Sequence, residues 1–248
     1  NMLLMGNSFF RPYAERFSEL ALDADFLEHR DTIVMRGGVY GTPIGLWTTE
    51  DTNTEIKQIL DSGNIDILGM TWYFNENNPL SGFTEWIDYA LQNNPSIKIF
   101  VHIPPIDFPA DWQQTAEDYG YNNIRDLYGY LVSDLTHKSV IDQLRELYPS
   151  TEIFTLPTGW ATFDLVDQYE NNLLLDDISL FGSYDDSIFR DTKGHQGKIV
   201  VNTGALIWLN GLYGVNLRTN DSDTGFNTDL HTIAENIMDL HDPDYKQQ

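Results

Sequence analysis

The chain of 248 residues contains no cysteine, which excludes disulfide bonds, thiolate metal sites and a cysteine nucleophile. Long apolar runs are also missing. The longest one, residues 205–209, has five residues, whereas a membrane-spanning helix needs roughly 20. We therefore expect no membrane-spanning segment.

Basic residues are scarce, because 14 Lys and Arg stand against 38 Asp and Glu and leave a net charge of −24. Binding to a phosphate backbone or an anionic membrane requires clustered cations, and the few here are scattered singly. We expect neither nucleic acid nor a membrane as a partner. Self-repulsion of so many carboxylates is screened by salt, so the charge favours a saline environment over a merely acidic protein. A secreted or periplasmic location is favoured if a signal peptide was removed ahead of Asn1.

Short apolar runs alternate with longer amphipathic segments, a pattern typical of βα units around a parallel sheet. Strands are expected at residues 2–5, 32–35, 65–68, 97–103 and 152–156. Helices are expected at residues 11–24, 54–60, 83–91, 138–147, 160–174 and 197–212. No stretch resembles a linker, so we predict one α/β domain over residues 1–248, with a C-terminal helix of about residues 226–241 packed on it.

Functional residues are expected directly after the strands, because open α/β sheets bind ligands beyond the carboxyl ends of their strands. Gly6-Asn7-Ser8 follows the first strand, which places the Ser8 hydroxyl in a strand-to-helix turn and its N–H near a helix N-terminus. The alternative is that Ser8 only caps the helix that begins near Arg11.

A hydroxyl becomes a nucleophile when a base takes its proton. His195 lies four residues after Asp191 and just ahead of an apolar helix, so one turn can supply an imidazole and the carboxylate that orients it. His102 ends the fourth strand, where it either lines a pocket or is structural. The other histidines have polar, helical or terminal surroundings and are expected in solvent: His29, His137, His231 and His241.

These segments resemble the sequence blocks of the SGNH, or GDSL-type, serine hydrolases. The Gly-Asp-Ser block of that family is similar to residues 6–8, with Asn in place of Asp, and its Asp-x-x-His block is similar to residues 191–195, with one additional residue. The resemblance covers residues 2–212. It implies a flavodoxin-like, three-layer α/β/α sandwich with a five-stranded, mostly parallel sheet.

The same resemblance implies roles for individual residues. Ser8 would be the nucleophile, His195 the base and Asp191 the acid that orients it. Because of the additional residue in the second block, Asp185 and Asp186 remain alternatives to Asp191.

An oxyanion hole is also implied by the resemblance, formed by the N–H of Ser8 and a glycine after the second strand. Gly41 matches that glycine best, and Gly38 is the alternative. The family's next block carries an Asn whose side chain completes the hole, and Thr71 stands at that position. Loss of one such donor typically costs about 2.7–4 kcal/mol in the transition state. We therefore expect a donor from Thr71, Asn75 or Asn77, a slow enzyme, or a different reaction.

The implied activity is hydrolysis of a carboxylic ester through a Ser-His-Asp acyl-enzyme, with no metal or organic cofactor. Aromatic side chains such as Trp72 and Trp112 follow the third and fourth strands. Together with Asn75, aromatic rings suit a sugar, which favours short-chain or acetyl esters on a carbohydrate. The alternatives are an acyltransferase of the same fold, a non-catalytic carbohydrate-binding protein and a metal-dependent hydrolase.

Overall fold

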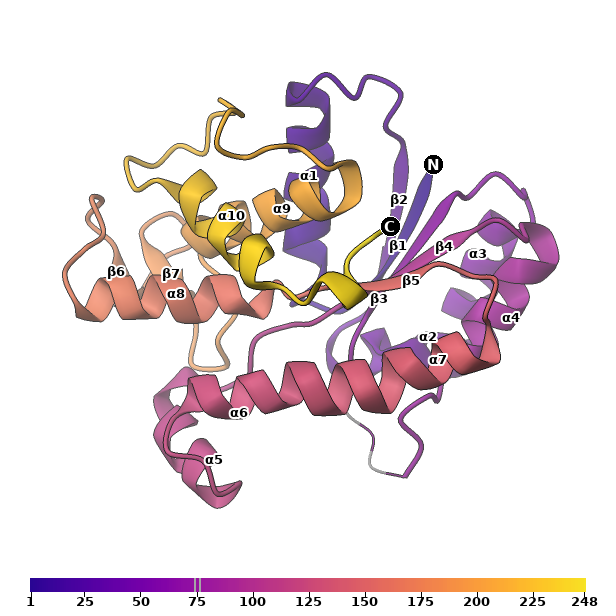
Figure 1. Ribbon diagram of the computed structural model, residues 1–248, viewed down its shortest axis with the longest axis horizontal. Coiled ribbons are helices and arrows are strands. Elements are labelled where there is room, and N and C mark those ends of the chain that lie inside the picture. The colour runs from indigo at the N-terminus through magenta and orange to yellow at the C-terminus, as the bar shows by residue number, and fades with distance from the viewer. Residues whose placement is uncertain (74, 76) are drawn as a thin grey trace.

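The computed structural model describes residues 1–73, 75 and 77–248. Its main sheet has five strands: β1 (Met2–Gly6), β2 (Asp31–Met35), β3 (Ile67–Thr71), β4 (Lys98–His102) and β5 (Ile153–Leu156). They run parallel in the order β2-β1-β3-β4-β5, as Figure 1 shows. The order reverses between β1 and β3, and a crevice for ligands forms at such a switch point. The predicted α/β class and parallel sheet are confirmed.

Helices cover both faces of the sheet because its buried strands alternate between two apolar cores. Leu4 and Phe100 belong to one core, and Leu3 and Val101 belong to the other. The first core is covered by α1 (Arg11–Asp23), α8 (Gly159–Glu170), α9 (Lys198–Tyr213) and α10 (Leu230–Leu240). The second is covered by α2 (Pro43–Thr48), α3 (Glu50–Leu60), α4 (Phe83–Asn93) and α7 (Asp142–Leu147). The result is the predicted three-layer sandwich.

One long helical rod, residues 124–147, contributes Val140, Ile141 and Leu144 to the second core and ends near the start of β5 (Figure 1). It consists of α6 (Ile124–Tyr130), a π-helical segment η3 (Leu131–Ile141) and α7. The hydroxyl of Thr136 donates to the carbonyl of Leu131, five residues earlier. The preceding α5 (Trp112–Asp118) packs beside α6. Long π-helical segments are rare and often adjoin functional sites.

Short elements complete the described chain. They are the 3₁₀ turns η1 (Gly38–Gly41), η2 (Pro109–Asp111) and η4 (Pro243–Tyr245), and a parallel pair of strands, β6 (Ser179–Phe181) and β7 (Ser187–Phe189). Helix α10 begins at Leu230, later than the predicted 226, because the Asp229 side chain accepts a bond from the N–H of Thr232 and caps it there. Among the described residues, no helix is long and apolar enough to cross a membrane.

The C-terminal segment folds back over β5, which corrects the expectation of solvated histidines. The Thr155 hydroxyl lies 3.0 Å from His137 Nε2 and 3.1 Å from His241 Nε2, and both rings are buried. His29 is buried as well, 3.4 Å from Asp31, and His231 is half-buried. The prediction was wrong because the tertiary packing of a terminal segment leaves no local signal in the sequence.

Candidate active site

Ser8 lies in a tight turn between β1 and α1. The carbonyl of Asn7 accepts bonds from the N–H groups of Phe10 and Arg11, and the Asn7 side chain accepts one from the N–H of Phe9. No side chain caps the start of α1, so Ser8 is not the cap that the alternative interpretation required. Among the described residues, the N–H of Ser8 has no protein acceptor. Both the hydroxyl and the N–H of Ser8 are therefore available to a ligand.

The hydroxyl of Ser8 lies 2.8 Å from Nε2 of His195, across a separation of 187 residues. The other ring nitrogen, Nδ1, lies 2.6 Å from Oδ2 of Asp191. A carboxylate at Nδ1 holds the proton there and leaves Nε2 free to accept the proton of the hydroxyl. The fold thus brings together the three side chains to which the sequence assigned the nucleophile, the base and the orienting acid.

The two alternative aspartates make other contacts. Oδ1 of Asp186 accepts bonds from the N–H and the hydroxyl of Ser183, and it caps that turn. Asp185 is exposed and lies 3.7 Å from the ammonium of Lys198. Within the described part of the chain, neither aspartate bonds to His195, so Asp191 is the carboxylate that contacts the imidazole.

The turn from Asp191 to His195 is closed by its own backbone. Oδ1 of Asp191 accepts bonds from the N–H groups of Gly194 and His195, and the N–H of Arg190 donates to the carbonyl of His195. Gly194 has a φ of +96°, a conformation that side chains disfavour. This glycine turn brings the carboxylate of Asp191 and the imidazole of His195 together within five residues of chain.

Two carboxylates, Asp191 and Asp107, lie close to the imidazole of His195. Burial alone would raise the pKa of Asp191, but the bonds from His195 and from the backbone outweigh it and lower that pKa, so Asp191 stays ionised. Asp107 is a second, half-buried carboxylate near the imidazole. Burial raises its pKa, although attraction to Lys193, 3.7 Å away, and to His195 opposes the rise.

Phe9 fixes the plane of the imidazole. Its ring stacks on His195 with centroids 4.7 Å apart and 20° between the planes, and the ammonium of Lys193 lies 5.6 Å from the centre of the same ring. The sequence interpretation missed Phe9, Lys193 and Asp107. The sequence positions of two of them could have indicated the site, since Phe9 is adjacent to Ser8 and Asp107 follows the fourth strand.

Gly41 packs directly against the turn that carries Ser8. A Cβ at this position would lie 2.6 Å from the carbonyl oxygen of Gly6 and 2.7 Å from Cα of Asn7. Only glycine allows the two backbones to approach this closely. Gly41 is therefore adjacent to the nucleophile turn, and Gly38 lines the neighbouring cavity.

Thr71 and His102 face the wrong way for the roles predicted for them. They are paired in register at the ends of β3 and β4, so their side chains share one face of the sheet. Both are fully buried, and the Thr71 hydroxyl lies 3.3 Å from His102 Nδ1. The rings of Phe10, Tyr13 and Trp208 surround His102. The assignments of Thr71 to the oxyanion hole and of His102 to substrate binding are thus corrected to structural roles.

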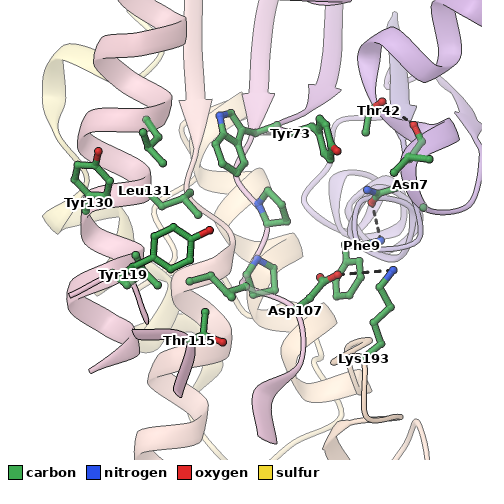
Figure 2. A pocket seen from close by; sticks show the side chains of 18 residues that line it. Asn7, Phe9, Thr42, Tyr73, Asp107, Thr115, Tyr119, Tyr130, Leu131 and Lys193 are labelled. Carbon is green, nitrogen blue, oxygen red and sulfur yellow. Dashed lines mark hydrogen bonds and ion pairs between the residues drawn. The ribbon is translucent and has the colours of Figure 1, made fainter. Parts of the chain in front are cut away.

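A cavity of about 380 Å³ adjoins the turn of Ser8, beyond the carboxyl ends of β1, β2, β3 and β4. Its size falls within the range of small-ligand sites, roughly 300–1,000 Å³. In Figure 2 the labelled Asn7, Phe9 and Thr42 lie at one side of the cavity, and Tyr119, Tyr130 and Leu131 lie at the other. The cavity therefore extends from the nucleophile turn to the helices α5, α6 and η3.

Other predicted binding residues divide between the cavity and the core. Trp72 lines the cavity, whereas Trp112 packs in the core against Phe163 and Phe189. Asn75 is absent from the described cavity wall, and its side chain instead accepts bonds from the N–H groups of the loop residues 77 and 78. Within the described chain, no three His, Asp or Glu side chains are grouped closely enough to hold a metal ion.

Comparison with known proteins gives little to add to this geometry. No protein-family model matches the chain, and no curated protein matches it significantly. A solved structure with limited similarity is the periplasmic domain of a lipopolysaccharide acetyltransferase from Salmonella ser. Paratyphi A. It has 13% sequence identity and a TM-score of 0.35, over 65% of this chain and 67% of that one. A TM-score this low identifies neither a family nor an activity.

Proposed function

We propose that this protein is a serine esterase of the SGNH type, in which Ser8, His195 and Asp191 form the catalytic triad. One observation supports the proposal most directly. Nε2 of His195 lies 2.8 Å from the Ser8 hydroxyl while Nδ1 of the same ring lies 2.6 Å from Asp191. A histidine with a purely structural role would not require a hydroxyl at one ring nitrogen and a carboxylate at the other, beside a cavity.

The reaction begins when His195 Nε2 removes the proton of the Ser8 hydroxyl and Ser8 Oγ attacks the carbonyl carbon of an ester. The imidazolium that forms is stabilised by Asp191. The same imidazolium then gives its proton to the departing alkoxide as the C–O bond breaks, which releases the alcohol and leaves Ser8 acylated. Water, deprotonated by His195, attacks the acyl-enzyme, and the acid leaves as Ser8 recovers its proton.

The negative oxygen of the tetrahedral intermediate needs donors beside Ser8. The unpartnered N–H of Ser8 is one, and the N–H of Gly41, on the segment that packs against the nucleophile turn, is the second that we propose. Since the Thr71 hydroxyl is buried beside His102, this oxyanion hole relies on backbone donors.

A p-nitrophenyl acetate assay on the wild type and on Ser8→Ala tests the proposal. We expect turnover in the wild type and a loss of at least about a thousandfold in the variant, because no other group can form the acyl-enzyme. Equal rates in the two proteins, with short and with long acyl esters, would instead favour a non-catalytic carbohydrate-binding protein on this fold.

Transfer of the acyl group to an alcohol uses the same acyl-enzyme, and it differs only in how well water is excluded at the second step. Product analysis in the presence of a competing acceptor alcohol separates the two activities. An acid as the main product supports the esterase, and a new ester as the main product assigns the protein to the acyltransferases. A saline environment is also part of this proposal, and a melting temperature that rises with salt concentration would support it.

A further inference from the structure

We propose that the cavity beside Ser8 binds the acyl part of the ester, and that this part is an apolar chain longer than acetyl. The inference rests on the proposed function, and it goes beyond it by naming the substrate class. Its starting point is the shape of the cavity, which reaches from the nucleophile turn to the helices α5, α6 and η3 (Figure 2). An acetyl group, with a single methyl, would leave most of the 380 Å³ unused.

The chemistry of the cavity wall favours a hydrocarbon chain. Beyond the mouth the wall is formed largely by apolar side chains, among them Ile106, Leu127, Leu131 and Leu135, with the ring of Trp72. The charged lining groups, Asp107 and Lys193, lie beside each other at the mouth, 3.7 Å apart. A sugar would need several polar partners along its length, whereas an alkyl chain gains free energy from each methylene that leaves water.

The geometry of the reaction assigns the cavity to the acyl part and not to the alcohol. The alkoxide must receive its proton from His195 Nε2, so the alcohol departs on the imidazole side of Ser8. His195 is not among the described residues that line the cavity, although Phe9, which stacks on it, is, and Val39 and Thr42, on either side of Gly41, line the cavity as well. The part of the cavity lined by Gly38, Val39 and Thr42 therefore lies on the oxyanion side of Ser8, and we assign it to the substituent of the acyl carbon.

The leucines of the helical rod set the depth of the cavity. Leu127, Leu131 and Leu135 follow each other at intervals of four residues, and the last two belong to the π-helical segment. Thr115 on α5 lines the cavity from the other helix. A larger side chain at Leu135 or at Thr115 would shorten the space available to the chain.

The experiment compares kcat/KM for p-nitrophenyl octanoate and p-nitrophenyl acetate. Burial of one methylene is worth about fourfold, so even partial burial predicts a preference of at least about tenfold for octanoate. Leu135→Trp and, separately, Thr115→Trp should each lower the octanoate-to-acetate ratio by about tenfold or more. The matched control is Leu147→Trp, at an exposed position of α7 outside the cavity, which should leave the ratio unchanged.

Several outcomes would overturn the inference. The first is a wild-type protein with a higher kcat/KM for the acetate than for the octanoate. The second is an octanoate-to-acetate ratio that neither cavity variant changes, although the variants fold. The third is a higher kcat/KM for octyl acetate than for the octanoate ester, which would assign the cavity to the alcohol. If no ester is turned over, the proposed function fails and calorimetry with octanoate decides the inference separately. Saturable binding that Leu135→Trp weakens supports it, and the absence of such binding refutes it.

Discussion

Asp191→Asn removes one charge from the site and keeps the shape of the side chain. The amide oxygen can still accept the bonds that Asp191 receives from the N–H groups of Gly194 and His195, so the turn should persist. What disappears is the negative charge 2.6 Å from Nδ1 of His195, which stabilises the imidazolium in the transition state. In place of Oδ2 the amide NH2 donates to Nδ1, so the ring proton moves to Nε2, which can no longer accept the proton of the Ser8 hydroxyl.

The expected magnitude follows from the exposure of Asp191. A hydrogen bond to a charged group is worth about 1.5–3 kcal/mol, and we take the lower part of that range, about 2 kcal/mol, because solvent screens a carboxylate that is 46% exposed. The lost charge alone corresponds to about thirtyfold in kcat/KM, and the misplaced ring proton should raise the total loss to about 10³–10⁴-fold. The loss should therefore be comparable with that of Ser8→Ala, although the nucleophile itself remains.

The assay is ester hydrolysis followed over a range of pH, with Asp185→Asn and Asp186→Asn as matched controls. These two aspartates bond elsewhere, so their variants should retain wild-type rates. The reasoning is refuted if Asp191→Asn is as active as the wild type, or if either control loses as much activity as Asp191→Asn does.

Three further predictions concern packing, pH and salt. Gly41→Ala should lower the esterase activity, and it should lower the free energy of unfolding by about 1–3 kcal/mol, because its Cβ would overlap the nucleophile turn. Gly37→Ala is the control, since its Cβ would point into open space and should change neither quantity. Burial lowers the pKa of His137 to about 3 and that of His241 to about 4, below the unfolded value of about 6.5. Protons then bind the unfolded chain first, so stability is full above about pH 6.5 and falls by about 2 kcal/mol per histidine on acidification to about pH 5. Urea unfolding at the two pH values should show this dependence, and His241→Gln should reduce it. With a net charge of −24, the melting temperature should rise between low salt and about 1 M NaCl, and a flat or falling curve would contradict salt adaptation.

Much of the fold could be predicted because strong local patterns specify it. All five sheet strands were predicted within two residues of their observed starts, since each is a short apolar run bounded by turn residues. The pair β6 and β7 was missed, because strands of three residues are too short to show a period. Helices α5 and α6 were missed as well, since their stability depends on packing against each other and on the core.

Part of the candidate site could also be predicted from local sequence patterns, and part of it could not. Positions after strands and motif order singled out Ser8, His195 and Asp191, because the carboxyl ends of parallel strands meet at one edge of the sheet. The faces on which Thr71 and His102 lie were not predictable, because strand register decides them. Phe9 was missed for a related reason, since its stacking on His195 arises only when residues far apart in the sequence fold together.

Covalent labelling with a fluorophosphonate tests the central claim most directly, because this reagent reacts with a serine only when a base activates it. Peptide mapping by mass spectrometry should locate the adduct on Ser8 in the wild type, and His195→Ala should abolish it. An unlabelled wild-type protein, or an adduct on another residue, would contradict the account.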